Sequence, residues 1–401
     1  MLRFLTAGES HGKGLTGIIE GMPSGVTISK EDIDRELKRR QQGYGRGGRM
    51  KIESDEVEIL SGVRWGKTLG SPITLFIRNR DWDNWEKAMN PDKTFEGLHP
   101  PVTKPRPGHA DLAGLLKYQH IDIRNVLERS SARETAMRVA IGAVAKQFLT
   151  NFNIKIGSFV TAIGPEEKQV ETAYLDEEEL LKLSNLADAS PVRSPWKETE
   201  AKFVEIIDQA LKSGNTVGGS FIVFATHVPV GLGSHVHWDR KLDSKIAMGI
   251  MSIQAIKAVE IGDGVLLGKK YGSEVMDEIF YDKNKKFYRK TNHMGGIEGG
   301  ISNGMPIIVK ATMKPIPTLR KPLKSVDIFT KENSLASYER SDVCAVPAAS
   351  IIAEAVLAWH IAEALIEKFG GDSLEETKTN FFYYHKTIME ENWLKHSEIK
   401  G

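Results

Sequence analysis

Two histidines in glycine-containing segments are the first candidates for acid–base chemistry. His11 lies in GESHG at residues 8–12, and His109 lies in RPGHAD at residues 106–111. Glycine lets the backbone approach a ligand closely, and imidazole gives or takes a proton near neutral pH. We expect Ser10 and the flanking glycines to position the His11 imidazole. The alternatives that stay open are a tight turn with an exposed histidine and a surface histidine held by neighbouring prolines.

Arginines are concentrated in segments that also contain glycine or serine. A guanidinium fork suits phosphates and carboxylates because it can bind them with two parallel hydrogen bonds. The residues are Arg40, Arg46 and Arg49 in the stretch 39–49, Arg106 beside His109, Arg129 and Arg133 in ERSSARET at 128–135, and Arg340 in RSDVC at 340–344. The glycines of 39–49 match the letters of a dinucleotide-binding fingerprint, but a charged helix precedes them instead of a buried strand. A mobile anion-binding loop is the better interpretation, and a solvated basic loop is the alternative.

Serine and glycine segments add further anion-binding candidates. Ser130 and Ser131 lie at a predicted helix N-terminus, where free backbone N–H groups attract anions, although simple capping would also explain them. The glycine-rich run 294–304, which includes Gly299, suggests backbone lying against a flat or phosphorylated ligand, with a flexible hairpin as the alternative. It leads into a strand that ends at Lys314, Pro315, Ile316, Pro317 and Thr318. Arg340 and Asp342 could line a site or simply pair with each other.

The composition narrows the class of protein. The chain has 401 residues, 40% hydrophobic and 27% charged, with a formal net charge of +1. A dedicated nucleic-acid binder usually carries a basic excess, so no nucleic acid is expected as a partner. Charged residues interrupt the longest apolar run, so no membrane span is expected. Cys344 is the single cysteine, which fits a reducing compartment. His235 and His237 lack a third ligand at a recognisable spacing, so no metal site is expected.

The elements that must position these residues indicate an α+β fold in a single domain spanning 1–401. Strands and helices are both present but do not alternate regularly. The predicted helices are 29–40, 134–150, 241–258 and 347–369, and the predicted strands are 56–63, 72–78, 219–230 and 305–313. The last helix is expected to bury a stripe of Ile352, Val356, Trp359, Ala362 and Ile366 and to end at Gly370. The stretches 165–200 and 370–401 are expected to be peripheral.

Taken together, the six segments resemble the chorismate synthase family from about residue 3 to about residue 366. GESHG with the downstream Gly21-Met22-Pro23, RSSAR at 129–133, and Arg340-Ser341-Asp342 leading to Glu354 look like that family's signatures. RPGHAD, the loop 39–49 and KPIPT at 314–318 also look like family segments. The resemblance implies a 1,4-anti elimination of phosphate from 5-enolpyruvylshikimate 3-phosphate. It further implies reduced FMN as cofactor, helices sandwiched between two antiparallel sheets, a homotetramer and a cytoplasmic location.

The resemblance also implies roles for individual residues. His11 would protonate the departing phosphate, His109 would protonate or pair with reduced flavin, and Asp342 would help proton movement at flavin N5. Arg40, Arg46, Arg49, Arg106 and Arg133 would bind the substrate's anionic groups or NADP. The implied flavin-lining residues are Arg129, Ser130, Ser131, Gln254, Ala255, Gly299, Lys314, Pro315, Ile316, Pro317, Thr318 and Arg340. Gln254 departs from the pattern, because a shorter polar residue is expected there.

Alternatives of other classes stay open at this point. A flavin- or nicotinamide-dependent oxidoreductase would account for the glycines, and an RNA-binding module would account for the arginine–glycine loop. Within the family, the sequence leaves open whether NADPH reduces the flavin on this chain or a separate flavin reductase supplies it. The modest length favours a separate reductase.

Overall fold

The computed structural model describes residues 1–47, 54–339 and 341–391. Its α-helices are α1 Lys30–Gln41, α2 Trp82–Met89, α3 Asp111–Tyr118, α4 Arg124–Ser130, α5 Thr135–Thr150, α6 Glu177–Asp188, α7 Lys197–Ser213, α8 Leu242–Met251, α9 Gly272–Val275, α10 Val346–Phe369 and α11 Leu374–Met389. Its longer strands are β1 Arg3–Ala7, β2 Gly14–Glu20, β3 Val57–Ser61, β6 Ile73–Arg78, β7 Lys155–Ile163, β9 Gly219–Thr226, β10 Ile256–Ile261, β11 Ile279–Asp282, β12 Lys286–Arg289 and β15 Ile307–Met313. The shorter strands are β4 Val63–Arg64, β5 Lys67–Thr68, β8 Glu166–Glu167, β13 Ile297–Glu298, β14 Ile301–Ser302, β16 Lys324–Val326 and β17 Asn333–Leu335.

Two antiparallel sheets provide most of the strand structure. The first has the strand order β1-β2-β6-β3, and the second has the order β10-β15-β9-β7-β8. In β6 the side chains of Ile73, Leu75 and Ile77 are fully buried, and the residues between them are less so. This alternation gives the first sheet one apolar face, which packs against α5. In the second sheet, β7 and β9 are buried along almost their whole length and contact α10, while α6 also packs on β7.

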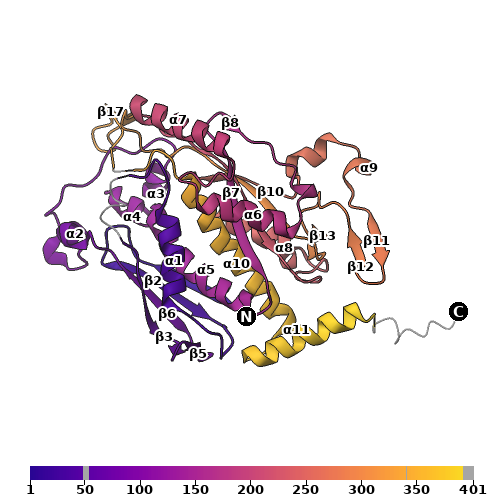
Figure 1. Ribbon diagram of the computed structural model, residues 1–401. Helices are drawn as coiled ribbons and strands as arrows, with labels where there is room; N and C mark the ends of the chain where they lie inside the picture. Colours follow the sequence, from indigo (N-terminus) through magenta and orange to yellow (C-terminus); the bar gives the residue numbers. More distant parts are fainter. Residues whose placement is uncertain (48–53, 340, 392–401) are drawn as a thin grey trace.

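Helices α5 and α10 form the centre of the core, with α5 next to the first sheet and α10 next to the second (Figure 1). They approach closely where Gly142 of α5 meets Ala355 of α10, since a Cβ on Gly142 would lie 2.3 Å from the Ala355 Cβ. α10 begins one residue before the predicted start and ends at Gly370 as predicted, and all five residues of the predicted stripe are buried, but the stripe is only part of the buried surface. The helix is buried on nearly all sides, because α5, α8 and the second sheet surround it.

A buried carboxylate ties the central helices together. Glu354 of α10 is fully buried and accepts hydrogen bonds from Arg39 of α1 (2.8 Å) and Lys146 of α5 (2.6 Å). Arg193 adds an ion pair at 3.4 Å and donates to Ser350 of the same helix at 2.9 Å. Arg193 lies in the stretch expected to be peripheral, so that expectation is wrong for this part of the chain. The stretch supplies the buried Arg193 guanidinium, which pairs with the buried carboxylate of Glu354 in α10.

Most predicted elements are present, and two segments differ. The strands predicted at 56–63 and 72–78 and the helix at 134–150 are confirmed, and Ser29 caps α1 by accepting from the Asp32 N–H at 3.1 Å. The helix predicted at 241–258 ends at Met251, because the chain turns at Ala255 and continues as β10. Within 370–401, which was expected to be peripheral, residues 374–389 form α11 at the edge of the body (Figure 1). Leu374 and Phe381 of this helix are buried in the main core, so the expectation is wrong for that part of it.

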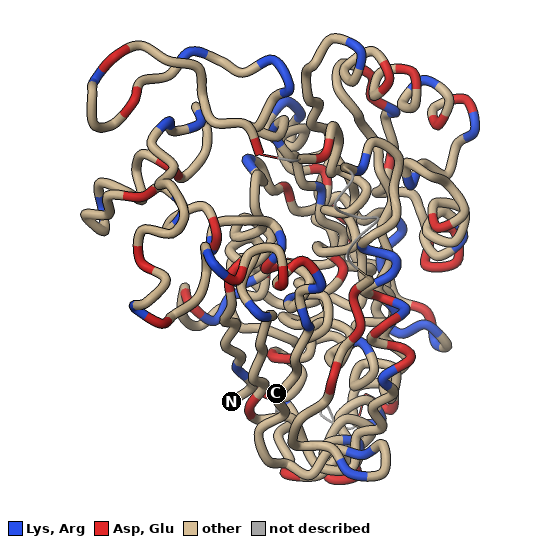
Figure 2. Tube along the Cα trace, turned by 90° about the vertical axis from the view of Figure 1, so that its left-hand side faces the viewer, with Lys and Arg blue, Asp and Glu red and all other residues tan. Residues whose placement is uncertain are grey.

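The apolar α10 is the described helix whose length and composition would allow it to cross a bilayer. However, 83% of that apolar window is buried inside the fold. Acidic and basic residues are interspersed along the trace of the chain (Figure 2). The apolar composition of α10 is therefore explained by its burial in the protein's own core.

Candidate functional site

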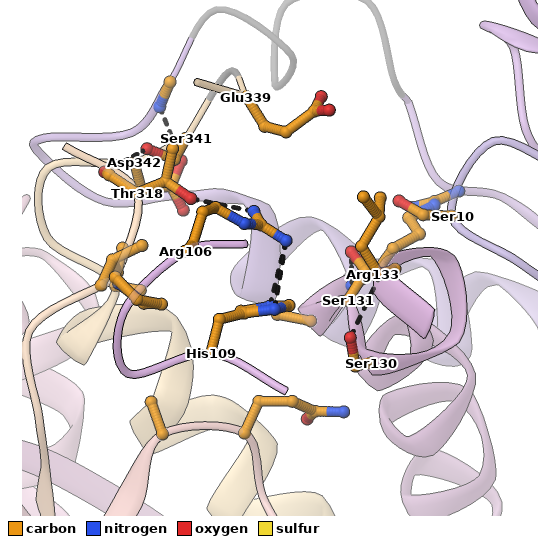
Figure 3. Close-up of a pocket in the computed structure, with 18 of the residues that line it drawn as sticks. Ser10, Arg106, His109, Ser130, Ser131, Arg133, Thr318, Glu339, Ser341 and Asp342 are labelled. Atoms are coloured by element: carbon orange, nitrogen blue, oxygen red, sulfur yellow. Dashed lines mark hydrogen bonds between the residues drawn. The ribbon is translucent and has the colours of Figure 1, made fainter. Parts of the chain in front are cut away.

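A cavity of about 410 Å³ collects residues from distant parts of the chain. Its walls come from the turn between β1 and β2, the C-terminal part of α1, the α4–α5 junction, the start of α3, the turn before β10, the exit from β15 and the segment before α10. Figure 3 shows Ser10, Ser130, Ser131 and Arg133 on one side of it, and Arg106, Thr318, Ser341 and Asp342 on the other. The cavity is therefore assembled by tertiary packing between the two halves of the chain.

His11 is held at the cavity wall by Glu128, a buried residue of α4. The His11 ring Nδ1 lies 2.8 Å from Glu128 Oε1, and the His11 backbone N–H donates to Glu128 Oε2 at 2.7 Å. The ring also stacks on Trp85 of α2, with 4.0 Å between centroids. Burial alone would raise the pKa of Glu128, but the contacts with His11 and then Arg124 hold it below its ordinary value. The carboxylate is thus ionised and acts as an acceptor for His11.

A second histidine–carboxylate pair lies at the start of α3. His109 Nδ1 is 2.5 Å from Asp111 Oδ1, and Arg106 Nε donates to Asp111 Oδ2 at 2.8 Å. Arg106 also donates to Thr318 Oγ1 at 3.0 Å, and it lies beside His109 in Figure 3. Burial would raise the pKa of Asp111, but hydrogen bonds from His109 and Arg106 hold it far below its ordinary value. Arg106 and His109 therefore share one anionic anchor.

Arg40 and Arg133 are buried beside each other around the carboxylate of Asp55. Arg40 Nη1 lies 3.3 Å from Asp55 Oδ2, and Arg133 Nη1 lies 2.5 Å from Asp55 Oδ1. Arg40 also donates to the Thr135 hydroxyl at 3.1 Å. Burial lowers the pKa of Arg40 to about 10, with Asp55 opposing and Arg133 and Arg46 adding to the fall. An anion bound beside these arginines would restore a more favourable balance of charge.

The arginine–glycine loop enters the site through Arg46 and Gly47. Asp342 Oδ1 accepts from the Gly47 N–H at 2.6 Å, and Asp342 Oδ2 lies 3.3 Å from Arg46 Nη1. Gly45 has a φ of +82°, and a Cβ on it would lie 2.8 Å from Ile207. Glycine at this position is explained by close packing, and the adjacent arginine is brought to the cavity as a result.

Gln254 and Ala255 form the part of the wall that precedes β10. Ala255 adopts the left-handed conformation, with φ of 68°, and its carbonyl accepts from the Lys314 N–H at 2.9 Å. Gln254 Oε1 is buried and has no hydrogen-bond partner among the described residues. Lys314 donates its ammonium group to the Gly108 carbonyl. A strained backbone and an unsatisfied buried acceptor at one cavity wall indicate a ligand-binding surface.

Most of the residues predicted from sequence meet in this cavity. Those that line it are Ser10, His11, Arg40, Arg46, Arg106, His109, Ser130, Ser131, Arg133, Gln254, Ala255, Lys314, Ile316, Pro317, Thr318 and Asp342. Arg49 and Arg340 lie outside the described residues. The cavity lining does not include Gly299, Pro315 or Arg129. The Arg129 guanidinium instead donates to the carbonyls of Thr6 and Gly8 at 2.8 and 3.0 Å, so its flavin contact stays a prediction.

Glu128, Asp55 and Asp111 are carboxylates of the site that the sequence analysis missed, whereas the fourth carboxylate, Asp342, was predicted. Glu128 is 117 residues from His11, and Asp55 is 78 residues from Arg133 and 15 from Arg40, and no motif marks either carboxylate. Asp111 stands two residues after His109, so its position in RPGHAD was an available signal. Because of these carboxylates, the site arginines already form ion pairs: Arg40 and Arg133 pair with Asp55, and Arg106 pairs with Asp111. Among the described residues, no group of three or more His, Cys, Asp or Glu is arranged to hold a metal ion.

The comparisons with known proteins agree over nearly the whole chain. A family model described as chorismate synthase matches residues 2–366. The chain is 56% identical over 386 residues to a chorismate synthase of Aquifex aeolicus, covering 96% of this chain and 97% of that protein. It is 55% identical over 391 residues to one of Geobacter sulfurreducens, covering 96% and 98%. A crystal structure of chorismate synthase superposes with a TM-score of 0.79 at 46% identity, covering 97% of this chain and 98% of the other. The chain therefore belongs to the chorismate synthase family.

Proposed function

We propose that this protein converts 5-enolpyruvylshikimate 3-phosphate into chorismate and phosphate by a 1,4-anti elimination that requires reduced FMN. The observation that carries the proposal is one cavity lined by His11 and His109, each held by a buried carboxylate behind it, together with Arg40, Arg46 and Arg133. The substrate has two carboxylates and a phosphate, and FMN adds a second phosphate. Burying such charges without cationic partners would be very costly.

The wall that contains Gln254 fits a flavin. The buried Gln254 Oε1 could accept a hydrogen bond from a cofactor N–H or hydroxyl group. Met313, Ile316 and Pro317 supply apolar lining beside it, and Lys314 supplies a cation. Burial, and then Lys257, lower the pKa of Lys314, so a nearby anionic group would stabilise its charged form. Bound reduced FMN would supply electron density as the substrate C–O bond breaks and would then accept hydrogen.

The chain's own residues bind, orient and move protons. Arg40, Arg46 and Arg133 would hold the substrate's anionic groups, which fixes the leaving phosphate in place. His11 would deliver a proton to a phosphate oxygen as the C–O bond breaks and the phosphate leaves with the bonding electron pair. His109, held by Asp111, would keep a proton beside the flavin ring. Asp342 would hold Arg46 and Gly47 in place, besides its expected help with proton movement.

Further properties are part of the same proposal. The packing of α5 on the first sheet and α10 on the second supports a single domain in which helices are sandwiched between two antiparallel sheets. We also propose a homotetramer in the cytoplasm and a separate flavin reductase, with NADPH reduction on this chain as the alternative. The contact sites for FMN at Gly299, Pro315 and Arg129, and for anions at Arg49, remain part of the proposal.

The test is an anaerobic assay with dithionite-reduced FMN and purified substrate, in which chorismate and inorganic phosphate are measured together. The proposal predicts the two products in a 1:1 ratio. Net consumption of hydride with a different product would identify an oxidoreductase instead. Absence of both products from a folded, flavin-bound protein would refute the proposed reaction.

A further inference from the structure

Glu128 contacts both the ring and the backbone of His11, whereas a simple ion pair needs only a contact with the side chain. Its two carboxylate oxygens are divided between the ring Nδ1 and the backbone N–H of the same residue, at 2.8 and 2.7 Å. The Glu128 carbonyl also accepts from the Ser10 N–H at 3.1 Å. One residue of α4 therefore holds the backbone and the ring of the Ser10–His11 turn together.

Arg124 and Trp85 complete a closed arrangement around this contact. Arg124 Nη1 donates to Glu128 Oε1 at 3.1 Å, and its guanidinium lies 4.7 Å from the centroid of the Trp85 ring. Trp85 in turn stacks on His11. The carboxylate fixes one edge of the imidazole and the indole fixes its plane, so the ring has little freedom to rotate.

We infer that Glu128 is a positioning residue for proton transfer by His11: it keeps the hydrogen on Nδ1 and leaves Nε2 as the nitrogen that serves the cavity. This inference rests on the proposed function. A carboxylate only accepts hydrogen bonds, so the contacting Nδ1 must carry the hydrogen. When the imidazolium gives its other proton to the departing phosphate, the neutral ring that remains is already in the correct tautomer. No ring rotation separates one turnover from the next.

A positioning role differs from a structural one in what it changes. If Glu128 acts through His11, its loss slows the chemical step and matters only while His11 is present. If it merely supports the fold, its loss adds to that of His11 and lowers stability or substrate affinity instead. A double-mutant cycle separates these cases because the coupling term isolates the interaction between the two residues.

The cycle consists of the parent, Glu128→Gln, His11→Ala and the double variant. Single-turnover phosphate release with prereduced FMN gives the rate of the chemical step, and titration of substrate onto the oxidised FMN complex gives affinity. Glu128→Gln should slow the step at least about tenfold, but no more than His11→Ala, whose expected loss is roughly 10² to 10⁴. Substrate affinity should stay within about threefold. In the His11→Ala background, Glu128→Gln should have no further effect on the rate.

A matched control removes a carboxylate from a histidine elsewhere. Glu363 lies 3.2 Å from His360 Nδ1 within α10, and neither residue lines the cavity. Glu363→Gln should leave the chemical step unchanged. If Glu128→Gln does not fold, Glu128→Asp keeps the charge beside Arg124 but shortens its reach, and its loss should likewise vanish when His11 is absent.

Equal losses in both His11 backgrounds, or a loss confined to substrate affinity, would overturn the inference. A His11→Ala variant with the parent's rate would also overturn it, because the proposed acid would then be unnecessary. Failure of the whole proposed function gives a different result, since the parent itself would release no phosphate with reduced FMN.

Discussion

Arg40 is the residue whose replacement tests the anion-binding account most sharply. Its guanidinium is buried, and its nearest acid, Asp55, is shared with Arg133. Burial, and then the neighbouring arginines, lower its pKa from 12.5 to about 10, so the guanidinium stays charged at neutral pH but its charge is less well stabilised than in water. That difference corresponds to about 3 kcal/mol. This cost of burying the charged guanidinium is consistent with a role for Arg40 in binding an anion.

The change we propose is Arg40→Met, which keeps an unbranched apolar side chain and removes the charge. A desolvated partner of an anionic ligand is worth about 2–5 kcal/mol when it is deleted. We therefore expect the variant to bind substrate about 30- to 5,000-fold more weakly. A solvated loop charge would contribute under about 1 kcal/mol.

Isothermal titration of substrate onto the protein with oxidised FMN bound measures this loss directly. Arg35→Met is the matched control, because Arg35 lies on the same helix, is exposed and pairs with Asp32 at the surface. The Arg35→Met variant should bind substrate with the affinity of the parent protein. Thermal unfolding of both variants checks that the fold is retained. If folded Arg40→Met binds substrate as tightly as the control, Arg40 does not hold a buried anion and the reasoning fails.

Three further substitutions test other parts of the site and core. Arg46→Ala should weaken substrate binding by about 2–5 kcal/mol, and a loss under about 1 kcal/mol in the same titration would make it a solvated loop charge. His109→Ala should change the visible spectrum and pH profile of bound reduced FMN, whereas an unaltered spectrum would leave it a structural residue. Glu354→Gln should destabilise the fold by about 3–5 kcal/mol at pH 7 in denaturant unfolding. Burial opposes ionisation of Glu354, but Arg39 and its other cations hold its pKa below the ordinary value, so the stability it provides is lost as pH falls. The gap to the Gln variant should therefore narrow in acid, and a constant gap would contradict this.

The sequence identified candidate site residues where they stand in short motifs of recognisable composition. His11 and His109 stand in short turns with glycine, and the arginines stand beside the glycines and serines that let a loop surround an anion. The bounds of α10 also followed from local signals, a long apolar run ended by Gly370. What the sequence did not show is how far the tertiary packing buries the other faces of this helix. A stripe of five residues was expected on α10, and only the packing of helices and strands around it shows that nearly every face is buried.

The remaining differences have the same origin. An apolar run does not distinguish helix from strand, so the break at Ala255 and the start of β10 were not predicted. Glu128 and Asp55 are held against their partners by the fold across many residues, and a single sequence contains no sign of such pairing. Arg193 was assigned to a peripheral stretch because its neighbours are polar, although its own side chain reaches the buried Glu354.

The central claim is that this cavity catalyses an elimination in which reduced FMN is required but not consumed. The most direct measurement is anaerobic turnover with a substoichiometric amount of dithionite-reduced FMN, following chorismate and the flavin spectrum together. We expect many molecules of chorismate per FMN, with the flavin still reduced when the substrate is exhausted. Full-rate turnover with oxidised FMN under strict exclusion of reductant, or one flavin oxidised for each product formed, would contradict the claim.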